Sequence, residues 1–375
     1  MIRRQRDEQV EARAAFILDG EHATQAYVDH FEVQMRRSTV TRLLSPPRVN
    51  RIGVLVLAAL LAASVLLAAA AAHVAQGMLA GANGVVAVNT ASGRLVAETP
   101  LAASPGAVSD GDGSVWVADP GTGQVSRFDP GSGVEVGRIL VGGEPGGIVS
   151  GDGAIWVAST AGATVTRIDP VSQSVTQRIP LPGGSLGAIA FGAGGLWVAD
   201  PAAHRLFEVD PATGSLERTL PVDLQPSAIA ATATAIWVAG YGNATVEKLA
   251  PASGRVIARV RVGDGPAALA FDAGALWVAN SLAGTVSRID PVTSAVTATV
   301  PVGSGPAALA AGAGSVWVAD QYSGAIARID PAANRVAAWI GVAGFPTSLT
   351  VSGSYVWLGV RRTAPAAPAD AAKAS

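Results

Sequence analysis

Cysteine is absent from the chain, which excludes disulfides and thiol chemistry and leaves no guide to the redox compartment. Lysine occurs only at positions 248 and 373, so nearly all of the 26 basic residues are arginine, and no local pattern explains this preference. Charged residues make up 14% of the chain, and the net charge is −2. Without an excess of positive charge no basic surface is expected, and we predict no nucleic-acid partner.

Tryptophan recurs at nearly constant spacing. Seven of the eight tryptophans stand 40 or 41 residues apart, each inside a short apolar phrase such as SVWVAD or ALWVAN. A constant period near 40 residues is typical of repeat architectures. The repeated tryptophans, which we expect to be structural, are Trp116, Trp156, Trp197, Trp237, Trp277, Trp317 and Trp357.

Each repeat is interpreted as four short strands. In the unit from 267 to 302, strands are predicted over 267–271, 275–279, 285–289 and 295–302, because runs rich in β-branched residues are bounded by Gly, Pro, Asp and Asn. Four strands in about 40 residues form one blade of a β-propeller. First strands are built from small residues, which fit the crowded axis. Fourth strands share a proline at one register (positions 100, 180, 221 and 301), which suits the outer edge of a sheet.

The phase of the repeat predicts how the ring closes. The region opens with a third and a fourth strand, over 85–89 and 95–101, and ends with a first and a second strand, over 347–351 and 355–360. Six complete units lie between them, so the two half-blades make a seventh and remove two open edges. The fold class predicted is all-β, a seven-bladed β-propeller over 84–361.

Aspartate followed by proline opens the last hairpin of most units, at 129–130, 169–170, 290–291 and 330–331. A ring of metal-binding carboxylates is one interpretation of this periodicity. Turn chemistry explains the pattern without it, because Asp caps a turn locally and Pro presets φ. We therefore expect no metal and no cofactor.

The phrases WVAN (277–280) and GTVSRIDP (284–291) resemble the YVTN-type, YncE-like propeller repeats of the NHL and streptogramin-lyase-like group. The resemblance covers about residues 84–360. It implies the propeller fold and leaves function open, because repeats of this type serve many roles.

Residues 53–72 form an apolar run without charges, which as a helix would span about 30 Å, the thickness of a hydrocarbon core. Five arginines crowd its N-terminal flank between 36 and 51, whereas the next full charge on the other side is Arg94. The positive-inside rule predicts a transmembrane helix over 52–74, a cytoplasmic segment over 1–51 and a propeller outside the cytosol, with the lipid bilayer as partner.

A cleaved signal peptide is the alternative, since the Ala-rich stretch at 68–75 offers cleavage sites and translation starting at Met35 would leave a short basic lead. The polar lead before the run is long for a signal peptide, so we favour the anchor. Residues 8–34 are interpreted as an amphipathic segment or a docking helix. The Ala/Pro-rich tail, 362–375, is predicted to be disordered.

Candidate binding residues lie on one face of the ring. Loops between second and third strands, and between fourth and first strands, share that face and vary in sequence, whereas the other loops are stereotyped. Binding groups are commonly carried on loops held by a rigid scaffold. The candidates are Asp119, Glu144, Asp200, His204, Asp223, Tyr241, Asn280, Asp320, Tyr322 and Phe345.

Catalysis has little support in the sequence. The propeller contains one histidine, His204, whereas the similar streptogramin-type lyases are known to depend on a histidine and a Mg²⁺ site, and a zinc site needs three or four ligands. The segment 183–187 matches GxSxG, but it joins two predicted strands and lacks the strand-to-helix turn that exposes such a serine. Residues 210–214 resemble quinoprotein propellers only superficially. We name no catalytic residue.

The sequence thus predicts a membrane-anchored extracytoplasmic β-propeller that binds a protein or cell-surface ligand at its variable face. A lyase-like or hydrolytic enzyme is one alternative, and a single-span sensor is another.

Overall fold

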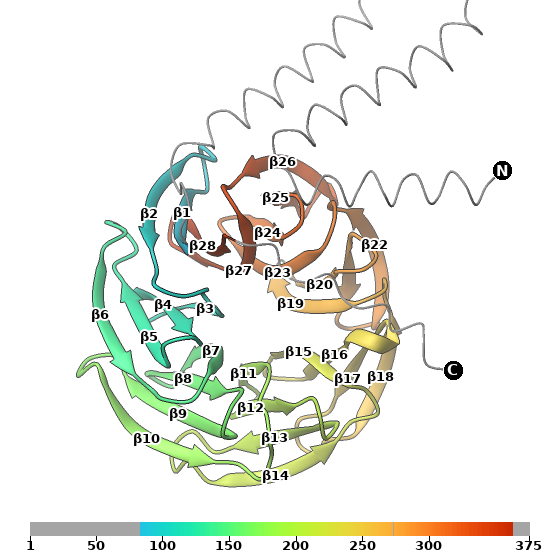
Figure 1. Ribbon diagram of the computed structural model, residues 1–375. Helices are drawn as coiled ribbons and strands as arrows, with labels where there is room; N and C mark the ends of the chain where they lie inside the picture. Colours follow the sequence, from blue (N-terminus) through green and yellow to red (C-terminus); the bar gives the residue numbers. More distant parts are fainter. Residues whose placement is uncertain (1–82, 273, 363–375) are drawn as a thin grey trace, which may run out of the picture. The chain divides into compact units, whose positions relative to one another are not determined.

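The computed structural model describes residues 83–272 and 274–362, which form seven four-stranded antiparallel sheets. Figure 1 shows the sheets arranged as the blades of a ring. The prediction of an all-β, seven-bladed propeller is therefore confirmed.

Blades are numbered here in the order in which their innermost strands occur in the chain. Blade 1 holds β3 (Val108–Gly111), β4 (Ser114–Asp119), β5 (Gln124–Phe128) and β6 (Glu135–Leu140); blade 2 holds β7 (Pro145–Gly151), β8 (Ala154–Ser159), β9 (Thr164–Asp169) and β10 (Ser174–Pro180). Blade 3 holds β11 (Ile189–Gly192), β12 (Gly195–Asp200), β13 (Arg205–Val209) and β14 (Leu216–Pro221); blade 4 holds β15 (Pro226–Ala231), β16 (Ile236–Gly240), β17 (Thr245–Leu249) and β18 (Val256–Arg261), with the 3-10 turn η1 (Tyr241–Asn243) between β16 and β17. Blade 5 holds β19 (Pro266–Asp272), β20 (Ala275–Asn280), β21 (Thr285–Asp290) and β22 (Ala295–Pro301); blade 6 holds β23 (Pro306–Gly312), β24 (Ser315–Asp320), β25 (Ala325–Asp330) and β26 (Arg335–Gly341). Blade 7 holds β27 (Phe345–Ser352), β28 (Tyr355–Arg361), β1 (Gly84–Asn89) and β2 (Leu95–Pro100).

Within each blade the chain runs outward from the axis. The first strands of neighbouring blades contact one another around the whole ring, from β3 through β7, β11, β15, β19 and β23 to β27 and back to β3. The four prolines predicted at the rim end β2, β10, β14 and β22, which are outermost strands. In blade 5 all four strands agree with the predicted segments to within one residue at each end.

Blade 7 closes the ring by joining the two ends of the repeat region. The N-terminal β1 lies between β2 and the C-terminal β28, with Val85 opposite Gly359 and Ala87 opposite Trp357. The Arg362 amide donates to Oδ1 of Asn83 at 2.9 Å, which ties the two ends of the propeller region together where other blades have a loop. The staggered closure predicted from the repeat phase is confirmed.

The seven repeated tryptophans are at most 1% exposed and pack between blades. Trp156 of blade 2, for example, shares a core cluster with Leu196 and Val198 of blade 3. The indole of Trp156 donates to the carbonyl of Gly151 at 3.0 Å, and Trp197 makes the same bond to Gly192. Each blade is thus fastened to the next through a large apolar side chain, and in these two blades the indole N–H is satisfied within its own sheet.

A cation lies over the tryptophan in six blades, which gives the arginines a role that the sequence pattern did not indicate. In blade 1 the Arg127 guanidinium carbon is 5.2 Å from the Trp116 ring centroid, and its Nη1 donates to the Pro170 carbonyl of blade 2 at 2.9 Å. Lys248 does the same over Trp237, with Nζ 2.7 Å from the Pro291 carbonyl of blade 5. These cations combine a cation–π contact with a charge-assisted bond to the next blade. The full set of pairs is Arg127–Trp116, Arg167–Trp156, Arg218–Trp197, Lys248–Trp237, Arg288–Trp277 and Arg328–Trp317.

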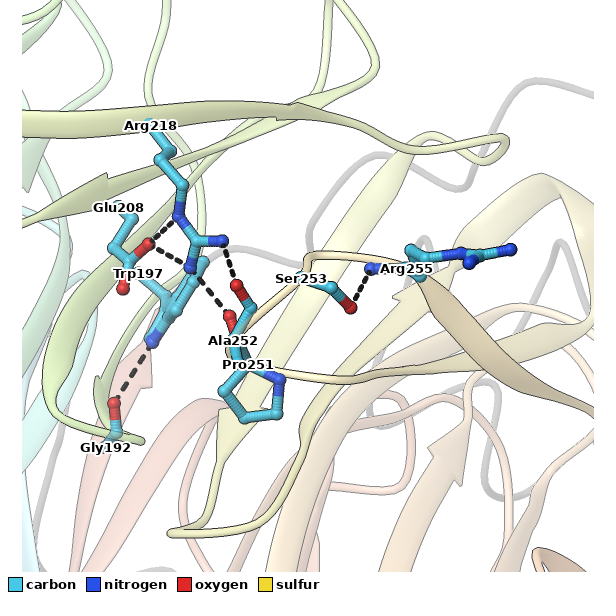
Figure 2. Close-up of polar contacts among 8 residues, drawn as sticks. All are labelled: Gly192, Trp197, Glu208, Arg218, Pro251, Ala252, Ser253 and Arg255. Atoms are coloured by element: carbon cyan, nitrogen blue, oxygen red, sulfur yellow. Dashed lines mark hydrogen bonds and ion pairs between the residues drawn. The ribbon is translucent and has the colours of Figure 1, made fainter.

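Blade 3 departs from this pattern (Figure 2). Glu208 stands directly opposite Trp197 on β13, where blades 1, 2, 4, 5 and 6 have their cation, and Arg218 of β14 pairs with Glu208. The Arg218 guanidinium lies over Trp197 and donates to the Pro251 and Ala252 carbonyls of blade 4 at 2.6 and 2.9 Å. The same positive charge therefore reaches the same place from a neighbouring strand.

The Asp-Pro turns behave as expected. Oδ1 of Asp129 accepts hydrogen bonds from the amides of Gly131 and Ser132 at 3.2 and 2.7 Å. The Ser132 hydroxyl also donates to Oδ1 of Asp129. This bond makes the largest contribution to a lowered pKa of the Asp129 carboxyl, and the two amide bonds lower it further. Turn capping accounts for these aspartates, as predicted.

Among the described residues, no helix is long and apolar enough to cross a membrane. The predicted cytoplasmic segment 1–51, the predicted transmembrane helix 52–74 and the tail beyond residue 362 lie outside the described residues.

Candidate functional site

The loops that follow second strands and those that follow fourth strands lie at one end of the ring, which we call the variable face. They are joined by backbone hydrogen bonds between neighbouring loops. The Thr160 amide donates to the Glu144 carbonyl at 2.8 Å, and the Ser281 amide donates to the Gly265 carbonyl at 2.7 Å. Residues from different loops are therefore held in fixed relation on this face.

Four of the predicted binding residues are buried beneath these loops. Asp119, Asp200, Asn280 and Asp320 all end a second strand, three residues after the blade's tryptophan, and are at most 6% exposed. Oδ1 of Asp119 accepts from the Thr122 amide at 3.2 Å, and Asp200 is paired with Arg205 at 2.9 Å. Their side chains hold the loops that follow them and are not presented to a partner.

Asp320 is the least compensated of these acids. Its Oδ2 accepts a hydrogen bond from the Ser304 amide at 2.9 Å. Burial raises the pKa of the Asp320 carboxyl, and the hydrogen bonds that it accepts oppose that shift only in part. Asn280 occupies the same register one blade earlier, where its amide donates to Oγ of Ser287 at 2.9 Å.

Three predicted residues are exposed but separate. Oε2 of Glu144 accepts from the Thr160 hydroxyl at 3.2 Å, and Asp223 forms an ion pair with Arg259. His204 is exposed and has a φ of 51°, a left-handed conformation in which most other blades place Gly or Ala. The structure brings neither a carboxylate nor a hydroxyl into hydrogen-bond contact with the His204 ring among the described residues, so these three form no common site.

The large side chains of the variable face gather on one side of the ring. Tyr241, Tyr322 and Phe345 belong to blades 4, 6 and 7 and are each partly buried. Blade 5, between them, presents Leu282, which is 55% exposed. At the positions four and five residues after their tryptophans, blades 1 to 3 have only Pro, Thr, Gly and Ala, and at the positions that correspond to Phe345 they have Ser, Glu and Ser. We call the group Tyr241, Leu282, Tyr322 and Phe345 the aromatic sector.

The aromatic sector is seated on glycines of the neighbouring loops. A Cβ atom placed on Gly305 would lie 2.2 Å from Cδ2 of Tyr322, and one on Gly265 would lie 2.7 Å from Cγ of Leu282. Both glycines have positive φ. Burial raises the pKa of the Tyr322 phenol, and the charge of the Tyr241 phenolate contributes to that shift.

Two residues of this face, Leu282 and Trp339, were not among the candidates predicted from the sequence. Leu282 carries no signal in the sequence, because it is an ordinary residue in a loop. Trp339, which is 49% exposed on β26, comes within 3.3 Å of a Cβ placed on Gly303 and so extends the apolar surface outward at blade 6. The sequence could have identified Trp339, because it is the one tryptophan outside the 40-residue period.

A cavity of about 530 Å³ lies on the axis and is lined by the opening residues of the first strands. Most of its wall is small and apolar, as expected from the sequence. The wall includes Ala107, Gly147, Ala188, Ala228, Ala268 and Ala308. The cavity also reaches Pro120, Thr160 and Arg361, which begin loops of the variable face or stand at the equivalent position.

The described residues provide no arrangement for metal or serine-hydrolase chemistry. No group of three or more His, Asp or Glu side chains within residues 83–272 and 274–362 could hold a metal ion. The GxSxG segment at 183–187 lies in the connection between β10 and β11, so no helix follows its serine. The strand-to-helix geometry that this motif needs is absent from that connection.

Comparison with known proteins supports the fold. No protein-family model matches the sequence, and neither does any curated protein. The structure is similar to the WD40 domain of Neurospora crassa Pan2, with a TM-score of 0.57 and 16% identity over 69% of this chain and 90% of that domain. It is also similar to Kuenenia stuttgartiensis hydrazine synthase, with a TM-score of 0.58 and 13% identity over 66% of this chain and 90% of that one. Such low identities establish the propeller fold alone.

Proposed function

We propose that this protein is a propeller scaffold of the YVTN type, anchored in a membrane by residues 53–72, that binds a protein or cell-surface ligand outside the cytosol. The sequence features behind the topology are the apolar run and the arginines on one flank of it. The binding role rests on the aromatic sector.

The observation that carries the proposal is the unequal distribution of side chains around the variable face. Four consecutive blades offer tyrosine, leucine, tyrosine and phenylalanine, and the other three offer mainly small residues. Aromatic side chains are enriched at protein interfaces, and tyrosine is among the residues that contribute most to binding there. A partner would therefore lie across blades 4 to 7 rather than around the whole ring.

A small set of substitutions tests the binding surface. Tyr241→Ala and Tyr322→Ala should each weaken binding of the physiological partner by about 1–2 kcal/mol or more, because each removes a rigid anchor. Val171→Ala and Val292→Ala are matched controls, since these valines are 84% and 86% exposed in the stereotyped turns of the other face. Loss of binding in the valine variants, with the tyrosine variants silent, would move the site to the opposite face.

The proposed topology has its own test. A reporter that is active only outside the cytosol, fused after Ser375, should be active while the protein stays in membranes after carbonate washing. A mature product that begins near residue 76 and is released from the membrane would favour the signal-peptide alternative instead.

A further inference from the structure

Arg361 is the one charged side chain that lines the axial cavity. It ends β28 and stands four residues after Trp357. The equivalent position is uncharged in every other blade, so the charge belongs to blade 7 alone. Those equivalent residues are Pro120, Thr160, Pro201, Tyr241, Ser281 and Gln321.

The hydroxyl groups around the cavity are used within the protein. Oγ of Ser348 donates to the Gly106 carbonyl at 2.6 Å, and Oγ of Ser227 donates to the Pro266 carbonyl at 2.7 Å. Each of these bonds joins the inner segments of two neighbouring blades. With these hydroxyls engaged, the wall consists of small apolar side chains and exposed backbone, and the Arg361 guanidinium is its one charged group.

That guanidinium lacks a partner in the described part of the chain. Nε of Arg361 is buried without a hydrogen-bond partner, and no ion pair between described residues includes Arg361. A guanidinium keeps its charge in proteins, and the partly buried Arg361 loses some of its hydration without a counter-ion to replace it. An anion beside Arg361 would relieve this.

We propose that the axial cavity binds a compact organic monocarboxylate, with its carboxylate on Arg361 and its apolar body among the alanines of the first strands. A single guanidinium matches one carboxylate, since its planar donors pair with both oxygens. A dianion such as phosphate would bring a second charge that no other cation of the wall could pair. The volume of about 530 Å³ suits a small organic molecule, because pockets of this kind span about 300–1,000 Å³. Arg361 stands opposite Phe345 of the aromatic sector, but no residue of that sector lines the cavity, so a small-molecule site there goes beyond the proposed scaffold role.

Calorimetric titration of the purified full-length protein tests the proposal. The probes are benzoate, cyclohexanecarboxylate and hexanoate, with benzamide as the neutral match of benzoate and inorganic phosphate as the dianion. We expect saturable binding at one site per chain for the carboxylate that fits best, and at least tenfold weaker binding of the amide and of phosphate.

Variants at neighbouring arginines locate the site. Arg361→Met should lower carboxylate affinity at least tenfold, and Arg361→Lys should lower it less, because the charge remains while the paired donors are lost. Arg362→Met is the matched control, since Arg362 is exposed and is not among the cavity residues, and it should change affinity less than twofold. Thermal unfolding without ligand checks each variant, and Arg361→Lys carries the test if the methionine variant does not fold. The proposal is overturned if no carboxylate of the set binds, if benzamide or phosphate binds as well as the carboxylates, or if Arg361→Met and Arg361→Lys both bind as the unaltered protein does.

Discussion

Arg218 lies 5.9 Å from the ring centroid of Trp197 and reaches it from the fourth strand of its blade, whereas the cation of each of the other five pairs comes from a third strand. The third-strand position in blade 3 is taken by Glu208, and the ion pair between Glu208 and Arg218 places the guanidinium over the indole. The contact between tryptophan and cation is thus present in blade 3 although the residue opposite Trp197 is acidic. We infer that the cation itself stabilises the junction between blades.

Moving the arginine of blade 3 from the fourth strand to the third should reproduce the arrangement of the other cation-bearing blades. Arg218→Ala should lower the free energy of unfolding by about 1–3 kcal/mol, because it removes a cation–π contact, an ion pair and two bonds to blade 4. Glu208→Arg should also destabilise, because it sets two guanidinium groups side by side. The double variant should recover to within about 0.5 kcal/mol of the unaltered protein, because a third-strand arginine would then face Trp197 as Arg127 faces Trp116. The alanine on the fourth strand would match Ala298 of blade 5, which stands opposite Arg288. Additive losses in a denaturant-unfolding cycle would contradict this account.

The closure of the ring makes the C-terminal strands essential to the N-terminal ones. Deleting residues 345–375 removes β27 and β28 and leaves β1 without a neighbour on its inner side. We expect a fall of more than about 10 °C in Tm, because a blade core that includes Trp357 is lost with the strands. Deletion of 363–375 alone is the control and should leave Tm unchanged. Equal melting of both truncated proteins would contradict the closure.

Close packing at the inner strands should make some glycines irreplaceable. A Cβ on Gly151 would lie 2.1 Å from the Phe191 ring of the next blade, so Gly151→Ala should cost about 1–3 kcal/mol of stability through overpacking. Gly184 provides the control, because a Cβ there meets nothing within 4 Å and its φ is not positive. Gly184→Ala should change the free energy of unfolding by less than about 0.5 kcal/mol. Chemical denaturation of the two variants would contradict the packing argument if their losses were equal.

Two aspartates should influence the pH dependence of stability in opposite directions. Burial raises the pKa of Asp320, so the folded protein holds its proton more tightly, and stability falls as pH rises above the ordinary value of 3.8. Asp320→Asn should remove that fall and stabilise the protein at pH 7, as Asn280 is already accepted at the same register in blade 5. Hydrogen bonds lower the pKa of Asp129, so its contribution is present above 3.8 and is lost as pH falls. Asp129→Asn should therefore lessen the loss of stability in acid. Denaturation curves between pH 3 and 7 should show slopes that change in opposite senses for the two variants.

The fold was predictable because its signals repeat. A residue that must lie between blades recurs with the period of the blade, so the spacing from Trp116 to Trp357 indicates the architecture. The phase of the first and last strands then predicts the closure through β1 and β28. Turn chemistry was also predictable, because Asp and Pro act within a few residues of one another in the chain.

The candidate site was less predictable, because the sequence shows which residues lie in or near a loop but not which way their side chains point. Asp119, Asp200, Asn280 and Asp320 look like loop residues in the sequence, but each is the last residue of a strand and is buried under its own loop. Five of the six cations recur eleven residues after their tryptophans, but the repeat does not indicate their role, because each contacts its tryptophan across a strand pair. Arg361 stands out only when the position four residues after each tryptophan is compared around the ring.

The central claim is that a partner binds across the aromatic sector of the variable face. Site-specific photo-cross-linking tests it most directly, because the method captures a partner whose identity is not yet established. A photoreactive phenylalanine analogue would replace Tyr241 or Tyr322 in the full-length protein in its own cells, with Ser132 and Ser253 of the opposite face as matched positions. We predict that illumination yields one discrete adduct from both tyrosine positions and none from the serine positions. Adducts from Ser132 or Ser253, with none from either tyrosine position, would contradict the account.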